Sequence, residues 1–210
     1  MARPYDGQVD DVAPSGGLDR TDAPGARSPA HGSLFFPAGS PEEAAYHTAM
    51  RASFDDDFAS RQRRFRERYG NPRPFTESER GALRDIMAPV LRDIMASGAV
   101  LPIIQEEAYP DGVEDGSFCI FLWGADGTGI GVWIYLARLG AEQGARVAED
   151  VQEWEIEELA ALGRPATWPE CPDHPDSHPL SAVVDGGNAL WRCPRSGRTI
   201  SAIGAFGTLR

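Results

Sequence analysis

Residues 118–136 read FCIFLWGADGTGIGVWIYL and carry a clear strand signal. Two short runs rich in β-branched and aromatic residues, Phe118–Trp123 and Gly131–Leu136, flank a turn rich in Gly and Asp. This pattern is typical of an antiparallel hairpin, with Cys119 expected in the core. The glycines do not indicate a phosphate-binding loop, because such a loop needs a helix N-terminus after it and a strand follows here. A third run, Val100–Gln105, extends the expected sheet to a further strand.

The helices expected around this sheet have recognisable start and stop signals. Thr76 and Glu79 form a capping box, and apolar residues recur from Leu83 onward with helical spacing. Pro89 lies inside this pattern and is expected to kink the helix or divide it in two, because proline lacks an N–H. Another helix is expected over Ala141–Leu162. These elements predict an α+β fold: a small antiparallel sheet of about three strands plus a C-terminal hairpin, packed with two or three helices.

Composition divides the chain into four parts. Residues 1–40 are rich in Gly, Pro, Ala, Ser and Asp, which predicts a disordered tail, although its Phe35-Phe36 pair could dock on the body or on a partner. Residues 41–75 form an Arg-rich helical segment, residues 76–165 the α+β core and residues 166–210 a hairpin with candidate metal ligands.

Several classes of protein are disfavoured by composition. No run approaches the roughly 20 apolar residues that span a bilayer, and the start MARPYDGQVDD lacks the order of a signal peptide, so we expect a cytoplasmic protein and no membrane partner. Three cysteines do not suit a secreted disulfide scaffold. All 20 basic residues are arginine, a bias typical of a GC-rich genome, and the absence of lysine excludes chemistry that needs a primary amine.

Acidic residues dominate the middle of the chain, whose net charge is −12 overall. Such a field repels phosphate backbones and attracts basic proteins. The loop after the third strand run carries a dense set of carboxylates: Glu106, Glu107, Asp111, Glu114 and Asp115. Their spacing departs from the calcium-loop signature, so a solvated loop is the plain alternative to a cation site or an acid/base pair. We take Glu106, Glu107, Glu114 and Asp115 as the candidate surface for a basic protein partner.

A helix is also expected over Pro41–Tyr69, where Ser40 can cap. Its second half surrounds two aromatic residues with arginines: Arg61, Arg63, Arg64, Arg66 and Arg68. Arginines mixed with aromatic rings can grip a phosphate backbone, which makes this segment a candidate nucleic-acid site. The alternative is an ordinary solvated face whose Phe58, Phe65 and Tyr69 pack inward.

Candidate metal ligands follow near the C-terminus, in WPECPDHPDSHPL (168–180) and WRCPRSGR (191–198). Cys171 and His174 form a C-x-x-H pair, His178 stands four residues further on, and Cys193 returns after an expected hairpin. Thiolate and imidazole are the donors that zinc prefers, so these four residues predict a Zn2+ site. A Pro-rich turn with two buried cysteines and two exposed histidines is the alternative.

This segment resembles a zinc ribbon, in which two Cys-Pro knuckles face each other across a hairpin. The resemblance covers only about the last forty residues and implies Cys171, His174 and Cys193 as ligands. Ser196 stands where the second knuckle of the family has its other cysteine, so His178 would have to replace it. If His178 stood aside, a metal-bound water could act in hydrolysis with Glu170 as general base.

Three functions are compatible with these features. The favoured one is a non-enzymatic interaction or regulatory protein, for example of the inhibitor or immunity type. Its acidic body would bind a basic partner, and its structural zinc knuckle would hold the C-terminal segment together. A nucleic-acid-associated factor that uses the Arg-rich helix and the knuckle is the alternative. A zinc-dependent hydrolase is a more distant one.

Overall fold

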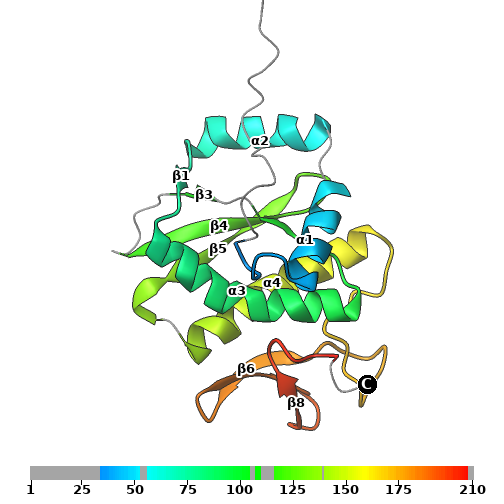
Figure 1. Ribbon diagram of the computed structural model, residues 1–210. Coiled ribbons are helices and arrows are strands. Elements are labelled where there is room, and N and C mark those ends of the chain that lie inside the picture. The colour runs from blue at the N-terminus through cyan, green and yellow to red at the C-terminus, as the bar shows by residue number, and fades with distance from the viewer. Residues whose placement is uncertain (1–33, 53–55, 105–106, 110–115, 139, 208–210) are drawn as a thin grey trace, which may run out of the picture. The chain divides into compact units, whose positions relative to one another are not determined.

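The computed structural model describes residues 34–52, 56–104, 107–109, 116–138 and 140–207 (Figure 1). All of them belong to one compact unit, Gly32–Arg210. The disordered tail expected over residues 1–40 therefore lies outside the described residues, except for residues 34–40. No helix in the described ranges is both long and apolar enough to cross a membrane.

The described elements follow one another as α1 (Pro41–Ala52), α2 (Asp56–Tyr69), β1 (Arg73–Pro74), α3 (Glu77–Ser97), β2 (Ile103–Ile104), β3 (Glu107–Ala108), β4 (Ser117–Trp123), β5 (Gly129–Tyr135), a short 3-10 helix η1 (Leu136–Arg138), α4 (Ala141–Ala161), β6 (Ser181–Asp185), β7 (Asn188–Arg192) and β8 (Thr199–Ala202). The strands form three small antiparallel sheets, ordered β1-β3, β2-β4-β5 and β6-β7-β8. The α+β fold expected from the sequence is confirmed for the described part of the chain.

The central sheet is built on the expected hairpin, with Phe118 opposite Ile134 and Trp123 opposite Gly129. Asp126 shapes the turn, because its carboxylate accepts hydrogen bonds from the backbone N–H and the hydroxyl of Thr128, at 2.8 and 2.7 Å. The third run contributes less than expected, since only Ile103–Ile104 of Val100–Gln105 is a strand in the described residues. Side chains alternate between the two faces of β4, as strand geometry requires. Phe118, Ile120 and Leu122 belong to one hydrophobic cluster, and Phe121 and Trp123 belong to another.

The larger cluster lies between one face of this sheet and the helices α3 and α4 (Figure 1). The apolar stripe predicted for α3 is buried there, and so is the stripe of α4. Leu34, Phe35 and Phe36 join the same cluster, and Tyr46 of α1 packs against both phenylalanines. The Phe35-Phe36 pair thus docks on the body of its own chain.

Helix α3 begins at the expected capping box. The Thr76 hydroxyl accepts from the Glu79 N–H at 3.3 Å, and the Glu79 carboxylate accepts from the Thr76 N–H at 2.8 Å. Two outcomes were expected for Pro89, a kink or a division of the helix, and division is wrong, because α3 runs unbroken from Glu77 to Ser97. The carbonyl deprived of its partner belongs to Asp85, an exposed position where water can replace the lost hydrogen bond.

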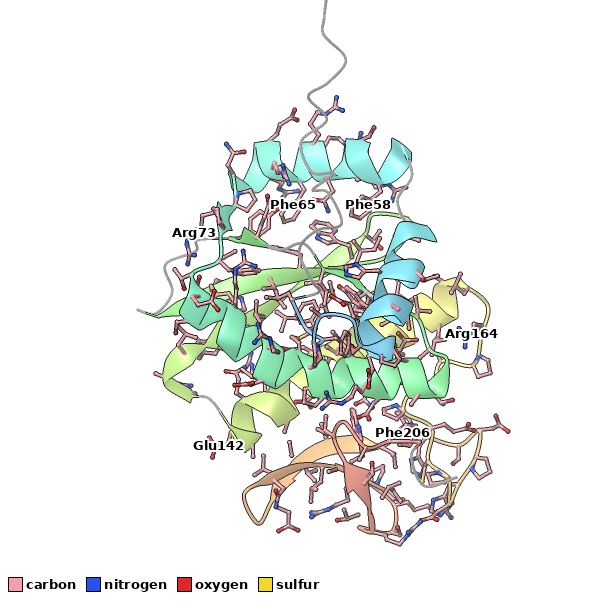
Figure 2. The ribbon with its side chains drawn as sticks, viewed as in Figure 1. Phe58, Phe65, Arg73, Glu142, Arg164 and Phe206 are labelled. Carbon is pink, nitrogen blue, oxygen red and sulfur yellow. The ribbon has the colours of Figure 1, made fainter. Side chains whose placement is uncertain are left out.

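The segment expected as one helix over Pro41–Tyr69 is described as two, α1 and α2, on either side of residues 53–55. Helix α2 lies across the other face of the central sheet from α3 (Figure 1). Its Phe58 and Phe65 point inward, as the solvated-face interpretation predicted (Figure 2). The side chain of Tyr69, the third residue of that prediction, is outside the described residues.

The C-terminal segment forms a separate meander. Strands β6 and β7 make the expected hairpin, with Asp185 opposite Asn188 across the Gly-Gly turn, and β8 adds a third strand beside β7. Helix α4 packs on β6 and β7, so this small sheet is supported from one side by the core. The cysteines and histidines singled out in the sequence lie next to this sheet: Cys171, His174 and His178 precede β6, and Cys193 follows β7.

Candidate metal centre

Two tight turns place the candidate ligands. In the first, the N–H of His174 donates to the carbonyl oxygen of Cys171 at 3.1 Å. In the second, Cys193 and Gly197 close a loop: the N–H of Gly197 donates to the Cys193 carbonyl at 2.9 Å, and the Cys193 N–H donates to the Arg198 carbonyl at 2.9 Å. Gly197 has a φ of 72°, a left-handed conformation that glycine adopts without strain.

The four candidate ligands converge. One ligand atom each from Cys171, His174, His178 and Cys193 lie within 4.8 Å of one another. His174 Nδ1 is 3.5 Å from both sulfurs, and His178 Nε2 is 3.8 Å from the sulfur of Cys193. In a tetrahedral zinc site with ordinary bond lengths, sulfur and nitrogen ligands stand about 3.6 Å apart. The cluster therefore has the size of a four-coordinate metal site, and these residues could hold a metal ion.

The histidine rings have defined roles in this geometry. His178 Nδ1 is 2.8 Å from the carbonyl oxygen of Pro179, so this nitrogen carries the proton and donates it. In a neutral ring that assignment places the lone pair on Nε2, which is directed at the Cys193 sulfur, and this is the usual arrangement for a histidine that ligates a metal. His174 instead presents Nδ1 to the two sulfurs. Each ring thus has one nitrogen directed at the cluster.

The two thiols differ in their surroundings. Burial raises the pKa of Cys193, but hydrogen bonds from the Ser196 side chain and from the Ser196 and Arg195 N–H groups outweigh it and bring the pKa to about 6. Burial raises the pKa of Cys171, with the neighbouring Cys193 adding to the effect. The pair thus holds one thiolate readily, and a bound cation would favour deprotonation of the second. Ser196, the departure from the ribbon pattern, acts here through the 3.4 Å contact of its N–H with the Cys193 sulfur.

A salt bridge ties the two turns together. Arg198 Nε donates to Asp173 Oδ2 at 2.7 Å, and a second guanidinium nitrogen contacts the other carboxylate oxygen. This bidentate geometry fixes the relative position of the two turns better than a single contact would. Glu170, the candidate general base of the hydrolase hypothesis, accepts a hydrogen bond from the Asp176 N–H at 2.9 Å.

Buried polar side chains of the core anchor the metal-ligand segment. The Gln152 amide of α4 donates to the carbonyls of Trp168 and Leu180, at 2.8 and 2.6 Å. The Trp168 indole donates to Ser97 Oγ of α3 at 2.9 Å and packs edge-on against Trp191. These bonds hold both ends of the first ligand turn against the two helices.

Asp93 of α3 makes a second anchor. Its carboxylate is fully buried and accepts three hydrogen bonds, from the Trp191 indole at 2.7 Å and from the N–H groups of Gly204 and Phe206 at 2.7 and 2.8 Å. Neither Asp93 nor Gln152 was recognised in the sequence, because nothing local marks a polar residue whose partners are far away in the chain. A carboxylate inside an otherwise apolar helical stripe was the one available signal.

The other sequence candidates lie away from this centre. Of the proposed acidic surface only Glu107 is described; Glu106, Glu114 and Asp115 are outside the described residues. Glu107 forms a salt bridge with Arg66 at 2.9 Å. One residue of the candidate acidic surface is therefore paired with one residue of the candidate nucleic-acid site. Arg61 contacts Asp126 at 3.7 Å, whereas Arg63, Arg64 and Arg68 are exposed on α2.

Comparison of the chain with protein-family models, with curated proteins and with solved structures finds no significant match. The fold and the cluster by themselves define an α+β protein with a candidate Cys2His2 metal centre. Its function has to be argued from the geometry of its own residues.

Proposed function

We propose that this protein is a non-enzymatic interaction protein whose C-terminal segment is held together by a structural zinc ion. The observation that carries the proposal is the convergence of Cys171, His174, His178 and Cys193 within 4.8 Å. Two thiolates and two imidazoles match the ligand set that zinc favours in structural sites.

Several contacts favour a structural role over a catalytic one. With four protein ligands the coordination sphere is closed and leaves no position for a reacting water. The hydrogen bonds of Gln152 and Asp93 link the ligand turns to α4 and α3, so metal binding would fix the position of the whole segment on the core. Glu170 is occupied by the Asp176 N–H, which does not favour a role as general base.

Elemental analysis of the purified protein tests the metal. We expect about one zinc per chain in the wild type and none in the double variant Cys171→Ser, Cys193→Ser. Cys119→Ser is the matched control, because Cys119 is also buried but lies in β4, outside the cluster. A wild type purified without metal that also fails to take up added zinc would refute the proposed centre.

The interaction role is supported by charge. The chain carries a net charge of −12, and Glu107 together with Glu106, Glu114 and Asp115 supplies a concentrated acidic segment that would steer a basic protein. An acidic protein that binds a basic partner in this way could act as its inhibitor or immunity subunit. A fluorescent arginine-rich peptide serves as a basic probe. We expect its binding to weaken sharply with salt and to be lost on charge reversal at these four positions; unchanged binding by the reversed variant would contradict the role.

Nucleic-acid association is the second candidate, favoured by the exposed side chains of Arg63 and Arg64 on α2. A gel shift with generic RNA and DNA at low salt tests it. A shift that disappears in the double variant Arg63→Ala, Arg64→Ala would support this function. The absence of any shift by the wild type would eliminate it.

A further inference from the structure

Three aromatic side chains cover the face of the central sheet that is turned away from α3 and α4. Phe121 and Trp123 are stacked, with ring centroids 5.2 Å apart and planes inclined by 25°, and Tyr109 stands edge-on to Phe121 at 4.9 Å. We call Tyr109, Phe121 and Trp123 the aromatic face. Such a layer on a sheet is a large apolar surface that needs a cover.

Helix α2 supplies this cover through two residues (Figure 2). Phe58 meets the Trp123 ring edge-on at 6.4 Å and is almost fully buried. Phe65 contacts all three rings of the aromatic face, at 5.4 Å from Tyr109, 4.6 Å from Phe121 and 4.9 Å from Trp123. The aromatic contacts between α2 and the aromatic face are thus made by two side chains seven residues apart, on one side of an amphipathic helix. We call the surface that these two side chains cover the seat.

This contact is separate from the main core. Phe58, Ile103 and Trp123 form a cluster of their own with Phe65 and Phe121, whereas the alternate residues of β4 face the larger cluster. Removing α2 would therefore expose the aromatic face without opening the core between the sheet and the helices α3 and α4. The contacts of the main core do not include Phe58 or Phe65 of α2.

Among the described residues, the contact between α2 and the sheet contains buried polar groups that no hydrogen bond satisfies. These groups are both amide atoms of Gln62 and the indole Nε1 of Trp123, and the two residues are only 5% and 3% exposed. Gln62 lies one turn from Phe58 and one from Phe65, on the same side of the helix. Buried polar groups without partners oppose burial, because they lose their hydrogen bonds to water. The closed position of α2 is thus less favourable than that of a permanent core helix.

Salt bridges at the edge of the contact between α2 and the sheet indicate which charge a helix bound there should carry. Arg66 of α2 contacts Glu107 at 2.9 Å, and Arg61 contacts Asp126 at 3.7 Å. All four side chains are more than a quarter exposed, so these pairs guide the helix more than they hold it. The sheet side of this edge is acidic and the helix side basic, which is the complementarity expected for a cationic helix.

We propose that α2 is a displaceable cover and that the aromatic face receives a basic amphipathic helix of a partner protein, which carries two aromatic residues seven positions apart. The inference rests on the proposed interaction function. It specifies that the basic partner binds through a helix and that this helix binds on the aromatic face. In the free protein α2 occupies the seat as a substitute for this helix. Partner binding then requires the open state, and its apparent affinity is reduced by the open fraction.

A labelled peptide with the sequence of residues 56–69 serves as the probe, with its scrambled sequence as control. We expect weak binding to the wild-type chain and at least ~10-fold tighter binding to the double variant Phe58→Ala, Phe65→Ala, whose own α2 no longer competes. Adding Trp123→Ala to that variant should abolish binding, because the seat is then lost. Glu67→Ala is the matched control, because Glu67 is exposed on the side of α2 away from Phe58 and Phe65, and it should leave the affinity unchanged. A double variant that binds no tighter than the wild type overturns the proposal.

Hydrogen exchange on the wild-type chain provides a measurement that does not depend on variants. The amides of α2 should exchange at least ~100-fold faster than those of α3, since α2 opens without global unfolding. Equal protection of the two helices would overturn the proposal. So would a stable dimer in which two chains exchange α2, because the occupant would then be a second copy of the chain.

Failure of this inference is distinguishable from failure of the proposed function. If α2 is locked but the arginine-rich peptide still binds in a salt-dependent way, the interaction role stands and only its seat is wrong. If α2 opens and the probe peptide binds as expected while charge reversal of the acidic residues changes nothing, the seat stands and the electrostatic role is wrong.

Discussion

Asp93 connects three separate parts of the chain through one carboxylate. Because it is fully buried, its negative charge is tolerated only through the donors of Trp191, Gly204 and Phe206. Burial raises the pKa of Asp93, and these three hydrogen bonds oppose that shift. The unfavourable burial of the Asp93 carboxylate is thus offset by hydrogen bonds that connect α3 to Trp191, Gly204 and Phe206.

Asp93→Asn should destabilise the protein by about 3 kcal/mol, because an asparagine amide group presents N–H groups to backbone and indole donors. Urea unfolding followed by tryptophan fluorescence measures the change. Asp85→Asn is the control, since Asp85 lies on the same helix and is exposed; it should cost less than ~0.5 kcal/mol. Equal effects of the two substitutions would show that the Asp93 bonds contribute little.

His178 and Ser196 together test the unusual fourth ligand. His178→Ala should lower zinc affinity roughly 100-fold or more, because loss of a ligand exceeds the effect of losing an outer hydrogen bond. Adding Ser196→Cys should restore much of it, since Ser196 holds the position of a ribbon cysteine and its N–H already contacts the Cys193 sulfur. Competition with a coloured zinc chelator measures both affinities.

His47→Ala is the matched control for that experiment, because His47 belongs to α1 and lies outside the cluster. It should bind zinc as tightly as the wild type. If His178→Ala also binds zinc with wild-type affinity, His178 is not a ligand and the centre is held by three residues.

At the scale of the elements, α3 shows how local signals determine a helix. Its capping box was readable from Thr76 and Glu79, and the structure confirms both bonds. Arg73 of β1 adds a bidentate salt bridge to Glu79, at 2.8 and 2.6 Å. Hydrogen bonding from Arg73 is the main reason that the pKa of Glu79 falls to about 2.

Thr76→Ala should destabilise the protein by about 1 kcal/mol, because the Glu79 N–H loses its acceptor at the helix start. Thr76→Ser keeps the hydroxyl and should stay close to the wild type. Urea unfolding at neutral pH compares the two substitutions. A serine variant as unstable as the alanine variant would mean that the threonine methyl group, and not the cap, stabilises the helix.

Elements with local signals were the ones that sequence could predict. The hairpin of β4 and β5 and the hairpin of β6 and β7 carry their turn residues between the two strands, and helix α4 shows its apolar stripe in its own sequence. The short strand β2 could not be delimited, because an apolar run such as Val100–Gln105 says nothing about which residues find a partner strand. Nor could the seating of Phe65 among Tyr109, Phe121 and Trp123 be derived, since it depends on tertiary contacts.

At the scale of the whole molecule, the four candidate metal ligands were predictable and the residues that anchor their segment were not. The residue types and short spacings of Cys171, His174 and His178 carry the chemistry of a metal site in themselves. The bond from Asp93 to Trp191 spans 98 positions of the chain and has no sequence signature. Sequence thus indicates what the C-terminal segment could bind, and the structure shows how that binding would be transmitted to the core.

Glu155 lies on the core side of α4 and should make the stability of the whole molecule depend on pH. It is fully buried; one carboxyl oxygen accepts the Val100 N–H at 2.8 Å, and the other has no hydrogen-bond partner in the part of the chain that the structure describes. Burial raises the pKa of Glu155 to about 8, with the Val100 N–H and Arg164 opposing the shift and Glu158 adding to it. In the folded protein this carboxyl is therefore largely protonated at neutral pH.

The sign of the effect follows from the direction of the shift. The unfolded chain releases the Glu155 proton near its ordinary pKa of 4.5, whereas the folded chain keeps it up to about pH 8. The stabilising contribution is complete below the lower value and is lost as the pH rises through the upper one, by at most roughly 1.4 kcal/mol per pH unit. Glu155→Gln keeps an acceptor for Val100 and does not titrate, so its stability should gain on the wild type as the pH rises.

Urea unfolding between about pH 5 and pH 8, at constant ionic strength, measures this difference. Glu153→Gln is the control, because Glu153 lies on the exposed side of the same helix and should leave the slope of the wild type unchanged. A difference between wild type and Glu155→Gln that is constant over this range would show that Glu155 is already ionised in the folded protein. In that case an interaction not seen at Glu155 Oε2 must stabilise the charge, and the core around α4 is wetter than its burial indicates.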